Sequence, residues 1–482
     1  MTGAVLKTVV AEQLGQAGSI PVRLRQQGPF VPRRARRSRQ GKGAVTDPRR
    51  STPRTDHVLA DARLQEQARR LGPGIVKAAV VDALAHCRDG RVAAEDVPGV
   101  ALSALPATAS SLRPVVNATG VLVHTNLGRA PLSSAARDAV VAAAGVTDVE
   151  LDLGSGRRDR RGRGAMAALA AAVPDAGGVH VVNNGAAALA LVACALGKGR
   201  KVIIARGELV EIGDGFRIPD LVESLGAEIR EVGTTNRVSL ADYADAVDDQ
   251  TAFVLKVHPS NFVVSGFTSG VPASELATLP VPVVADIGSG LLAPHPRLPD
   301  EPSASAMLRA GVALVTASGD KLLGGPQCGL LLGDADLVRT LRRHPFARAL
   351  RVDKLTLAAL EATLNGPSPP VRVALDTPVA TLRERAERLR EQLPGTSVVA
   401  STAVVGGGGA PGVELPSAAL SVPSSWADPL RRGEPPVVGR LTDGAMLLDL
   451  LAVDPTDDAT LARAVRRAAQ TPVETSSDTV DR

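Results

Sequence analysis

The chemistry that this sequence supports is indicated first by a single lysine. Lysine is rare, with eight residues among 55 basic ones, and Lys321 lies in the glycine-bounded segment SGDKLLGG of residues 318–325, directly after an apolar run. A lysine that is shielded from water has a lowered pKa and can form a Schiff base, whereas an arginine keeps its proton. A lysine that only ends a strand is the alternative interpretation of this residue taken alone.

Two other apolar runs end in residues that would complement such a lysine. Residues 281–285 lead to Asp286 in the sequence DIGSG, where a buried carboxylate would keep a pyridinium nitrogen protonated. Residues 179–183 lead into a helix whose first N–H groups would bind a phosphate. We therefore predict a pyridoxal 5'-phosphate site formed by Lys321, Asp286, Asn184, Gly185, Ala186 and Ser318.

These residues need a sheet that brings several strand ends to one edge. From residue 113 to about residue 335, Val- and Ile-rich runs alternate with Ala-rich stretches, which is typical of an α/β fold with a mostly parallel sheet between helices. Ligands bind at the carboxyl ends of such strands. The predicted strands are residues 179–183, 201–205, 252–256, 281–285 and 312–316. The order of phosphate cradle, carboxylate and lysine matches aminotransferase-like pyridoxal-phosphate enzymes.

The rest of the chain is predicted to form separate regions around this large domain. Residues 354–364, 379–392 and 458–469 have helical patterns, and residues 397–404 have a strand pattern, followed by a glycine run at 406–409. The predicted regions are a basic, disordered extension (1–45), a helical region interrupted at Gly72-Pro73-Gly74 (46–112), the large cofactor-binding domain (113–365), a small α+β domain (366–470) and a disordered tail (471–482).

The charge distribution separates one segment from the rest of the chain. The net charge is +5, but residues 21–54 hold ten arginines and one lysine against one aspartate, a net charge of +10. Such a segment cannot bury enough apolar surface to fold alone, and it attracts phosphate backbones. A functional RNA-binding arm is one interpretation, and a solvated tail or an over-long predicted start is the equal alternative.

Composition argues against several other classes of protein. Only 2% of the residues are aromatic, which weakens RNA recognition by stacking platforms. The three cysteines lack CxxC spacing and the seven histidines lack metal-ligand spacing, so neither a disulfide framework nor a metal is expected. No apolar run approaches the roughly 18 residues of a membrane span, and we expect a cytoplasmic protein.

Six longer segments carry a family resemblance. They closely resemble bacterial selenocysteine synthases, the L-seryl-tRNA(Sec) selenium transferases, from about residue 47 to residue 468. The segments are VNATGVLVHTNLGRAPL (116–132), RGELVEIGDGFRIPD (206–220), GTTN (233–236), VHPSNF (257–262), SGDKLLGGPQ (318–327) and RALRVDK (348–354).

The resemblance implies both a reaction and partners. The enzyme would convert L-seryl-tRNA(Sec) to L-selenocysteinyl-tRNA(Sec) with selenophosphate, by pyridoxal-phosphate-dependent β-elimination of the serine hydroxyl to a dehydroalanyl intermediate and addition of selenium. The helical region before residue 113 would contact the tRNA. The chain would form a homo-oligomer built from dimers, of which a decameric ring is one form, with active sites at the dimer interface.

The resemblance also implies roles for individual residues. Asp320 matches a position with a catalytic role, and we hypothesise that it helps to protonate the departing hydroxyl. Arg129, Arg348 and Arg351 match the arginines that bind selenophosphate, and Arg348 and Arg351 stand three apart on a predicted helix. An aspartate that shapes the turn and a solvated arginine face are the simpler readings. The role of His258 stays open.

Two other functions compete with this one. A related pyridoxal-phosphate lyase acting on a small phosphorylated sugar acid would keep Lys321 and Asp286 but need no RNA. A catalytically silent RNA-binding relic would bind no cofactor. Arg129, Arg348, Arg351 and the basic amino-terminal region favour the tRNA substrate.

Overall fold

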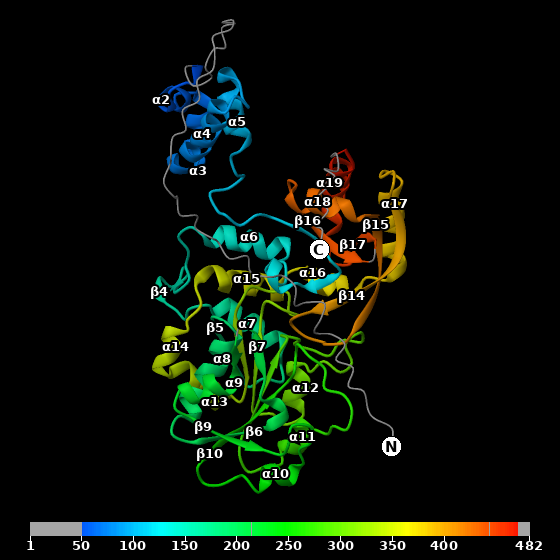
Figure 1. Ribbon diagram of the computed structural model, residues 1–482. Coiled ribbons are helices and arrows are strands. Elements are labelled where there is room, and N and C mark those ends of the chain that lie inside the picture. Colours follow the sequence, from blue (N-terminus) through cyan, green and yellow to red (C-terminus); the bar gives the residue numbers. More distant parts are fainter. Residues whose placement is uncertain (1–50, 214, 443, 471–482) are drawn as a thin grey trace, which may run out of the picture. The chain divides into compact units, whose positions relative to one another are not determined.

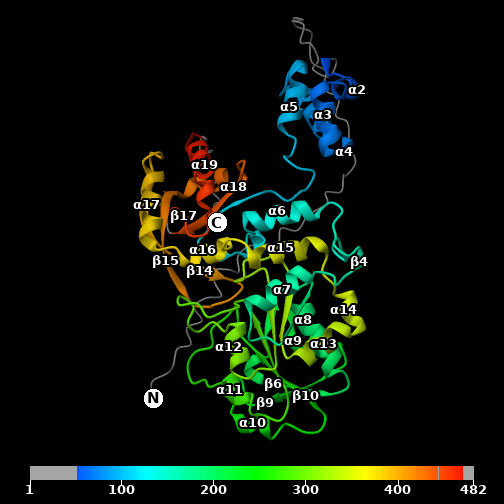
Figure 2. The same cartoon turned by 180° about the vertical axis from the view of Figure 1, so that it is seen from behind.

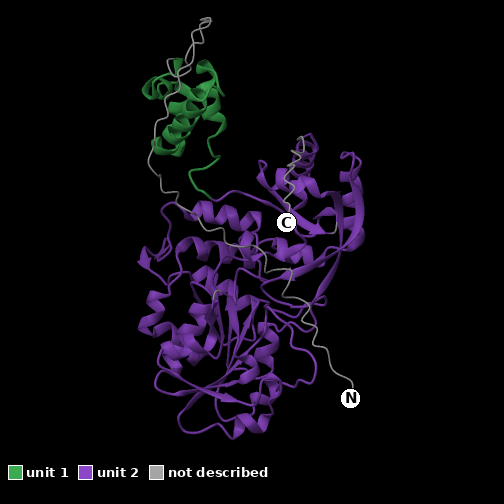
Figure 3. Cartoon of the chain, in the orientation of Figure 1, with its two compact units in different colours: residues 1–111 green, residues 112–482 purple. Residues whose placement is uncertain are grey.

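The computed structural model describes residues 51–213, 215–442 and 444–470, and the predictions for residues 1–45 and 471–482 lie outside them. The chain divides into two compact units, Met1–Ser111 and Leu112–Arg482, which Figure 3 shows in different colours. Among the described residues, no helix is both long and apolar enough to cross a lipid bilayer.

The first unit is made of short helices around a small apolar core. Its elements are α2 (Thr55–Leu59), α3 (Ala62–Leu71), α4 (Pro73–Arg88), η1 (Ala94–Asp96) and α5 (Val97–Ser103). The predicted interruption is confirmed, because Gly72, with a φ of 96°, ends α3 and Pro73 begins α4. Proline is favoured at the first helical position, where its missing N–H costs nothing. Leu64, Val80 and Leu84 are completely buried in the core.

The second unit contains a seven-stranded sheet. Its strands are β5 (Gly178–Val182), β6 (Lys201–Ala205), β9 (Glu228–Val232), β10 (Thr251–Val257), β11 (Val283–Gly288), β12 (Leu314–Ser318) and β13 (Gly329–Gly333), in the order β5-β13-β12-β11-β10-β6-β9. All neighbours are parallel except β13, which is antiparallel to β12 and β5. The five predicted strands are confirmed, although β11 and β12 begin two residues later than predicted.

Helices cover both faces of this sheet, as Figures 1 and 2 show from opposite sides. Successive strand residues point to opposite faces, so in β6 Ile203 packs into one apolar cluster and Ile204 into another. One cluster includes α7 (Arg163–Ala172), α11 (Ala273–Leu276), α12 (Ala304–Arg309) and α15 (Lys354–Asn365), and the other includes α8 (Gly185–Val192), α9 (Ile218–Ser224), α13 (Ala335–Arg343) and α14 (Pro345–Ala349). Burial on both faces explains why the strands are apolar along their whole length.

A second sheet contains six strands, which come from the beginning and from the last part of the second unit. Its strands are β1 (Val116–Ala118), β2 (Val121–Val123), β14 (Ser397–Gly406), β15 (Glu414–Pro423), β16 (Val437–Thr442) and β17 (Ala445–Asp449), in the order β1-β16-β17-β15-β14-β2. The sequence pattern predicts a large domain over residues 113–365, but residues 116–118 and 121–123 form the two edge strands of this second sheet. Their apolar side chains complete its core, where Leu122 and Val123 are buried.

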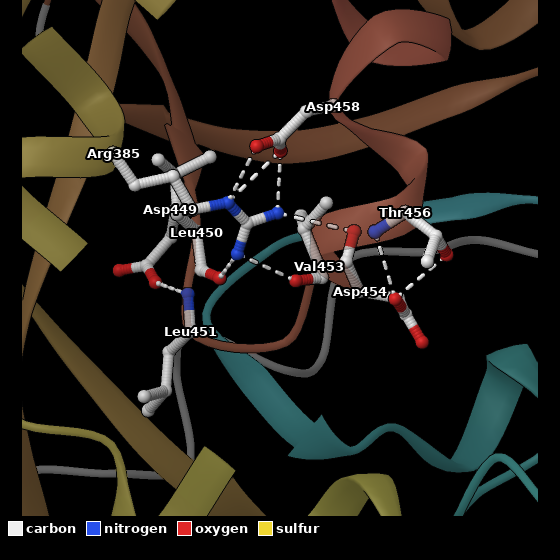
Figure 4. A network of polar contacts seen from close by, with 8 residues as sticks. All are labelled: Arg385, Asp449, Leu450, Leu451, Val453, Asp454, Thr456 and Asp458. Carbon is white, nitrogen blue, oxygen red and sulfur yellow. Dashed lines mark hydrogen bonds and ion pairs between the residues drawn. The ribbon is translucent and has the colours of Figure 1, made fainter. Parts of the chain in front are cut away.

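Four helices of the described residues share the apolar core of the second sheet: α16 (Pro370–Asp376), α17 (Val379–Arg390), α18 (Ala427–Arg432) and α19 (Asp458–Gln470). Arg385 of α17 is buried and donates to the Asp458 carboxylate and to three backbone carbonyls, those of Leu450, Val453 and Asp454 (Figure 4). The planar guanidinium fork satisfies several acceptors at once. Arg385 therefore ties α17 to the segment that leads into α19.

Short elements connect these layers. They are α6 (Ser134–Ala143) and α10 (Leu240–Ala244), the hairpins β3 (Leu151–Asp152) with β4 (Arg157–Arg158) and β7 (Glu211–Gly213) with β8 (Phe216–Arg217), the 3₁₀ turns η2 (Thr125–Leu127), η4 (Arg206–Glu208), η5 (Ser424–Trp426) and η6 (Pro455–Asp457), and the π-helical turn η3 (Ala193–Gly197). Helix α6 lies against α15 in both views.

Candidate active site

A cavity of about 350 Å³ lies at the carboxyl ends of the strands of the large sheet. Its wall brings together all six residues that we predicted to bind the cofactor, namely Asn184, Gly185, Ala186, Asp286, Ser318 and Lys321. They come from the ends of β5, β11 and β12 and from the first turn of α8. Parallel strands bring these distant parts of the sequence to one edge.

Lys321 stands in the turn that follows β12. Burial lowers the pKa of its amine, and the charge of Asp286 acts in the opposite direction. Gly408, in the loop after β14, lies so close to the lysine that a Cβ there would be 3.1 Å from Lys321 Cγ and Cδ. The stem of Lys321 is thus covered by the second sheet's loop, which favours the unprotonated, nucleophilic amine.

Asp286 lies on β11 at the wall of the cavity. Its Oδ1 accepts a hydrogen bond of 2.9 Å from the Thr316 hydroxyl on the neighbouring strand β12. Burial raises the pKa of Asp286, while the hydrogen bond from Thr316 and the charge of Lys321 lower it. A buried carboxylate of this kind gains from a cationic N–H partner. Sequence reasoning missed Thr316, although its place in a strand beside Asp286 could have indicated it.

The first turn of α8 faces the same cavity. The Asn184 side chain caps the helix by accepting from the Ala187 N–H at 2.8 Å. Gly185 follows, and a Cβ at this position would lie 2.5 Å from Ser318 Oγ. The absence of a side chain therefore brings the serine hydroxyl next to the helix N-terminus, whose N–H groups have no partner within the helix.

Pyridoxal phosphate fits these residues. The Gly185 and Ser318 pair forms a cradle that a side chain would fill, and Asp286 provides a buried acceptor for the pyridinium N–H. Lys321 provides an amine of lowered pKa in the same cavity. Residues of three kinds, each suited to a different part of the cofactor, thus share one wall.

Arg129 is the one arginine of the predicted anion-binding set that lines this cavity. Its Nη1 forms an ion pair with Asp320 Oδ2 at 2.6 Å. Asp320 is buried and is not part of the cavity wall. The side chain next to Lys321 therefore contacts Arg129 rather than the space where a substrate would bind.

Arg348 and Arg351 do not join Arg129 within this chain. The predicted common helix is wrong, because α14 ends at Ala349 and Arg351 lies in the following loop. Pro345 starts that short helix, and Asp353 caps the next one, α15. Arg348 is exposed, and Arg351 lies 3.8 Å from Glu150. Neither arginine lines the cavity.

His258 lies just beyond β10, on the cavity wall. Its backbone N–H donates to the Asp286 carbonyl, and its Nε2 lies 3.1 Å from the carboxylate of Glu301. Sequence reasoning singled out His258 but missed Glu301, because a lone glutamate between two distant motifs carries no pattern. The cavity wall also includes Ser260, Asn261 and Gln327, which lie inside the quoted family segments.

Two protein families match this chain. The family described as L-seryl-tRNA selenium transferase matches residues 115–454, and that described as selenocysteine synthase N terminal matches residues 49–88. The chain belongs to the L-seryl-tRNA selenium transferase family. The family predicted from the six sequence segments is confirmed, and the matched residues include the whole wall of the cavity.

Curated relatives in the selenium transferase family cover most of the chain. The L-seryl-tRNA(Sec) selenium transferase of Moorella thermoacetica is 45% identical over 391 residues, which cover 75% of this chain and 83% of the relative. The protein of the same name from Geobacter sulfurreducens is 41% identical over 460 residues, 86% of this chain and 98% of the relative.

A solved structure supports the fold class predicted for this chain. D-Glucosaminate-6-phosphate ammonia-lyase matches with a TM-score of 0.54 and 18% sequence identity, covering 74% of this chain and 96% of that chain. At this identity the likeness concerns the fold alone. It confirms the predicted fold class.

Proposed function

We propose that this chain is an L-seryl-tRNA(Sec) selenium transferase that uses pyridoxal phosphate and selenophosphate. The observation that carries the proposal is that Lys321, Asp286 and the N-terminus of α8 line one cavity inside the segment that matches the transferase family. The sugar-acid lyase and the silent relic are not favoured. The curated relatives that this chain matches over most of their length are named L-seryl-tRNA(Sec) selenium transferases.

The chain's own residues suit the three parts of the cofactor. The Lys321 amine would bind the aldehyde carbon, Asp286 would accept from the pyridinium N–H, and the α8 N-terminus with Ser318 would hold the phosphate. When bound, pyridoxal phosphate withdraws electrons from the α-carbon of an attached amino acid, which makes the α-proton acidic and the β-hydroxyl able to leave.

Lys321 also suits the proton transfer. Its amine, with a pKa lowered by burial, would take the α-proton of the seryl group. The hydroxyl leaves the β-carbon as water, taking the proton that Lys321 removed from the α-carbon. The selenium of selenophosphate then bonds to the β-carbon, and the α-carbon takes up the proton that the selenophosphate carried. Water then cleaves the selenium–phosphorus bond and releases phosphate, so the reaction needs no oxidant or reductant.

Arg129 is suited to attract the anionic selenium donor. Its guanidinium reaches the cavity, and Asp320 holds it there through the 2.6 Å ion pair. We therefore assign Asp320 the role of positioning Arg129 rather than that of protonating the leaving hydroxyl. Asp320 directly precedes Lys321 in the chain. Its ion pair with Arg129 therefore fixes the position of the Arg129 guanidinium relative to the lysine.

We further propose that Arg348 and Arg351 act in the cavity of a neighbouring subunit. Both side chains are exposed in this chain and stay outside its own cavity. A homo-oligomer built from dimers would explain why the family segment at 348–354 keeps two arginines near a surface. The helical unit that matches the family's N-terminal region would contact the tRNA. We also propose a cytoplasmic location, because the proposed substrate is an aminoacyl-tRNA.

The decisive experiment identifies the amino acid on the tRNA after the reaction. The purified protein, loaded with pyridoxal phosphate, is incubated with seryl-tRNA(Sec) and selenophosphate, and the amino acid is released and measured by mass spectrometry. We expect selenocysteine with the native chain and serine with Lys321→Ala. Serine alone with the fully loaded native chain would overturn the proposal.

A binding experiment separates substrate binding from chemistry. Lys321→Ala should retard seryl-tRNA(Sec) in a gel as strongly as the native chain does, because no RNA contact is assigned to the cavity lysine. A protein without residues 1–45 should bind the RNA more weakly, most of all at low salt, if the basic segment contributes. Loss of RNA binding in Lys321→Ala would contradict this division of roles.

A further inference from the structure

Glu301 is a fully buried carboxylate behind the wall of the active-site cavity. It lies between β11 and α12, and its side chain has 0% exposure. It is not one of the residues that line the cavity. Burying a carboxylate is costly unless hydrogen bonds compensate, so the position of this group needs an explanation from its contacts.

One oxygen of Glu301 binds two donors from different parts of the fold. Oε2 accepts from the Ala410 backbone N–H at 2.5 Å and lies 3.1 Å from His258 Nε2. Oε1 is buried and has no hydrogen-bond partner among the described residues. The carboxylate thus connects the end of β10, through His258, with the loop that follows β14.

The contact with Glu301 selects one state of His258. When Glu301 is ionised it only accepts hydrogen bonds, so its partner is the imidazole with a proton on Nε2. In the neutral ring this leaves Nδ1 as an acceptor. The His258 side chain is 22% exposed at the cavity wall, and its backbone N–H donates to the Asp286 carbonyl. Glu301 therefore determines what kind of group the histidine presents to a ligand.

The same contact holds a loop against Lys321. We call residues 406–410 the glycine loop. A Cβ on Gly408 would lie 3.1 Å from Lys321 Cγ and Cδ, and one on Gly409 would lie 2.7 Å from Ser289 Cβ and 3.2 Å from Glu301 Oε1. The backbone of the loop therefore packs where no side chain fits, and the Ala410 N–H anchors its end.

We propose that Glu301 is a positioning residue that holds His258 with its proton on Nε2 and at the same time keeps the glycine loop on Lys321. The proposal goes beyond the proposed function, on which it rests only for the meaning of Lys321 and His258. A substitution of Glu301 should then change two things, the position of the glycine loop and the nitrogen of His258 that carries the proton. A residue that only fills space would not connect them.

Hydrogen–deuterium exchange tests the loop on the full chain prepared without pyridoxal phosphate. In Glu301→Ala, the amides of residues 405–412 should exchange about tenfold faster than in the native protein, because the Ala410 N–H loses a charged acceptor. Glu301→Gln should restore slow exchange, since its oxygen has two lone pairs. Unchanged exchange in Glu301→Ala would overturn the proposal.

Asp449→Ala is a matched control for this experiment. Asp449 is also fully buried, accepts from Ser417 Oγ and the Leu451 N–H through one oxygen, and has a second oxygen without a partner among the described residues. Its substitution should speed exchange near residues 450–452 and leave residues 405–412 unchanged. Equal acceleration of residues 405–412 would show a general loosening and contradict the proposal.

A second variant covers the case in which Glu301→Ala does not fold. Glu301→Asp keeps the charge but is shorter by one methylene, about 1.5 Å, and so cannot reach both donors. Exchange in residues 405–412 should again rise. If Glu301→Asp exchanges like the native chain, the two-donor contact is not what holds the loop.

A double-mutant cycle tests the effect on His258. Glu301→Gln keeps an acceptor for the loop but removes the negative charge that holds the Nε2 proton of His258. It should lower kcat for selenium transfer about tenfold with little change in KM, and it should add nothing when His258 is already phenylalanine. Independent, multiplying effects would overturn the coupling. If the chain transfers no selenium at all, the exchange experiment still decides the proposal, so the two failures remain distinguishable.

Discussion

Asp320 and Arg129 are separated by 191 positions in the sequence, and their side chains form an ion pair of 2.6 Å next to Lys321 in the chain. The contact is reinforced by the backbone, since the Ala130 N–H donates to the Asp320 carbonyl. Arg129 has a φ of 66°, a left-handed conformation that is unfavourable for a residue with a side chain. The turn that carries Arg129 is thus held in place by the residue next to Lys321.

Asp320→Asn should therefore act on the selenium donor. We expect the KM for selenophosphate to rise about tenfold, because Arg129 loses its charged partner, and the free energy of unfolding to fall by about 1 kcal/mol. Steady-state kinetics and urea unfolding measure the two effects. Asp428→Asn, which removes an exposed ion pair with Arg431, is the control. A loss of kcat with unchanged KM would instead support a direct proton transfer by Asp320.

Gly185→Ala should weaken cofactor binding. The added Cβ would lie 2.5 Å from Ser318 Oγ and would push the hydroxyl away from the start of α8. We expect the affinity for pyridoxal phosphate, measured by absorbance titration, to fall about tenfold or more. Gly74→Ala, where a Cβ would have no atom within 4 Å, should leave the affinity unchanged. Native affinity in Gly185→Ala would argue against the phosphate site.

His180 should make the fold sensitive to mild acid. Burial, and then the charge of Arg342, lower the pKa of His180 to about 4, from 6.5 in an unfolded chain. The unfolded state therefore binds this proton more tightly, so its contribution to stability is complete above pH 6.5 and is lost as the pH falls towards 4. The native chain should lose about 2 kcal/mol more than His180→Leu between pH 7 and pH 5.

Urea unfolding of the native chain and His180→Leu at several pH values tests this prediction. Above pH 7.5 the difference in free energy of unfolding between the two proteins should stay constant, which serves as an internal control. If the two proteins lose the same stability between pH 7 and pH 5, another group is responsible for the acid sensitivity.

Arg385→Lys should be almost as harmful as Arg385→Ala. A lysine keeps the charge, but its single nitrogen cannot reach the Asp458 carboxylate and the carbonyls that the guanidinium now satisfies (Figure 4). We expect a loss of about 3 kcal/mol in the free energy of unfolding. Arg390→Lys, on the same helix but in an exposed pair with Glu387, should lose almost nothing. Equal unfolding midpoints for Arg385→Lys and the native chain would contradict this role.

The sequence was a good guide to the large sheet because its strands are buried on both faces. Continuous apolar runs such as residues 201–205 and 252–256 are hard to interpret in any other way. The strands of the second sheet were harder to predict, because β1 and β2 are three residues long and lie in a segment that also carries a motif. Their partner strands, β16 and β14, lie about 280 or more residues later in the chain, and no local sequence pattern predicts that pairing.

The candidate site shows the same limit. Lys321, Asp286 and Asn184 could be predicted because each lies near the carboxyl end of a strand, and these strand ends meet at one edge of the sheet. The pairing of Asp320 with Arg129 and the two contacts of Glu301 depend on how loops fold back, which spacing does not encode. Three-residue spacing predicts one helix for Arg348 and Arg351, but it takes no account of Asp353, which caps the start of α15. Helix α14 ends at Ala349, and Arg351 lies in the loop between the two helices.

The pairing of β1 with β16, where Val116 lies opposite Val437, has a consequence for how the protein is made. A ribosome synthesises Val116 early and Val437 near the end, so the nascent chain carries an unsatisfied strand edge through most of its translation. Long-range pairing of this kind is slow, and the folding intermediates that precede it are prone to aggregate. A messenger truncated before codon 437 would yield an incompletely folded protein that chaperones bind and proteases degrade.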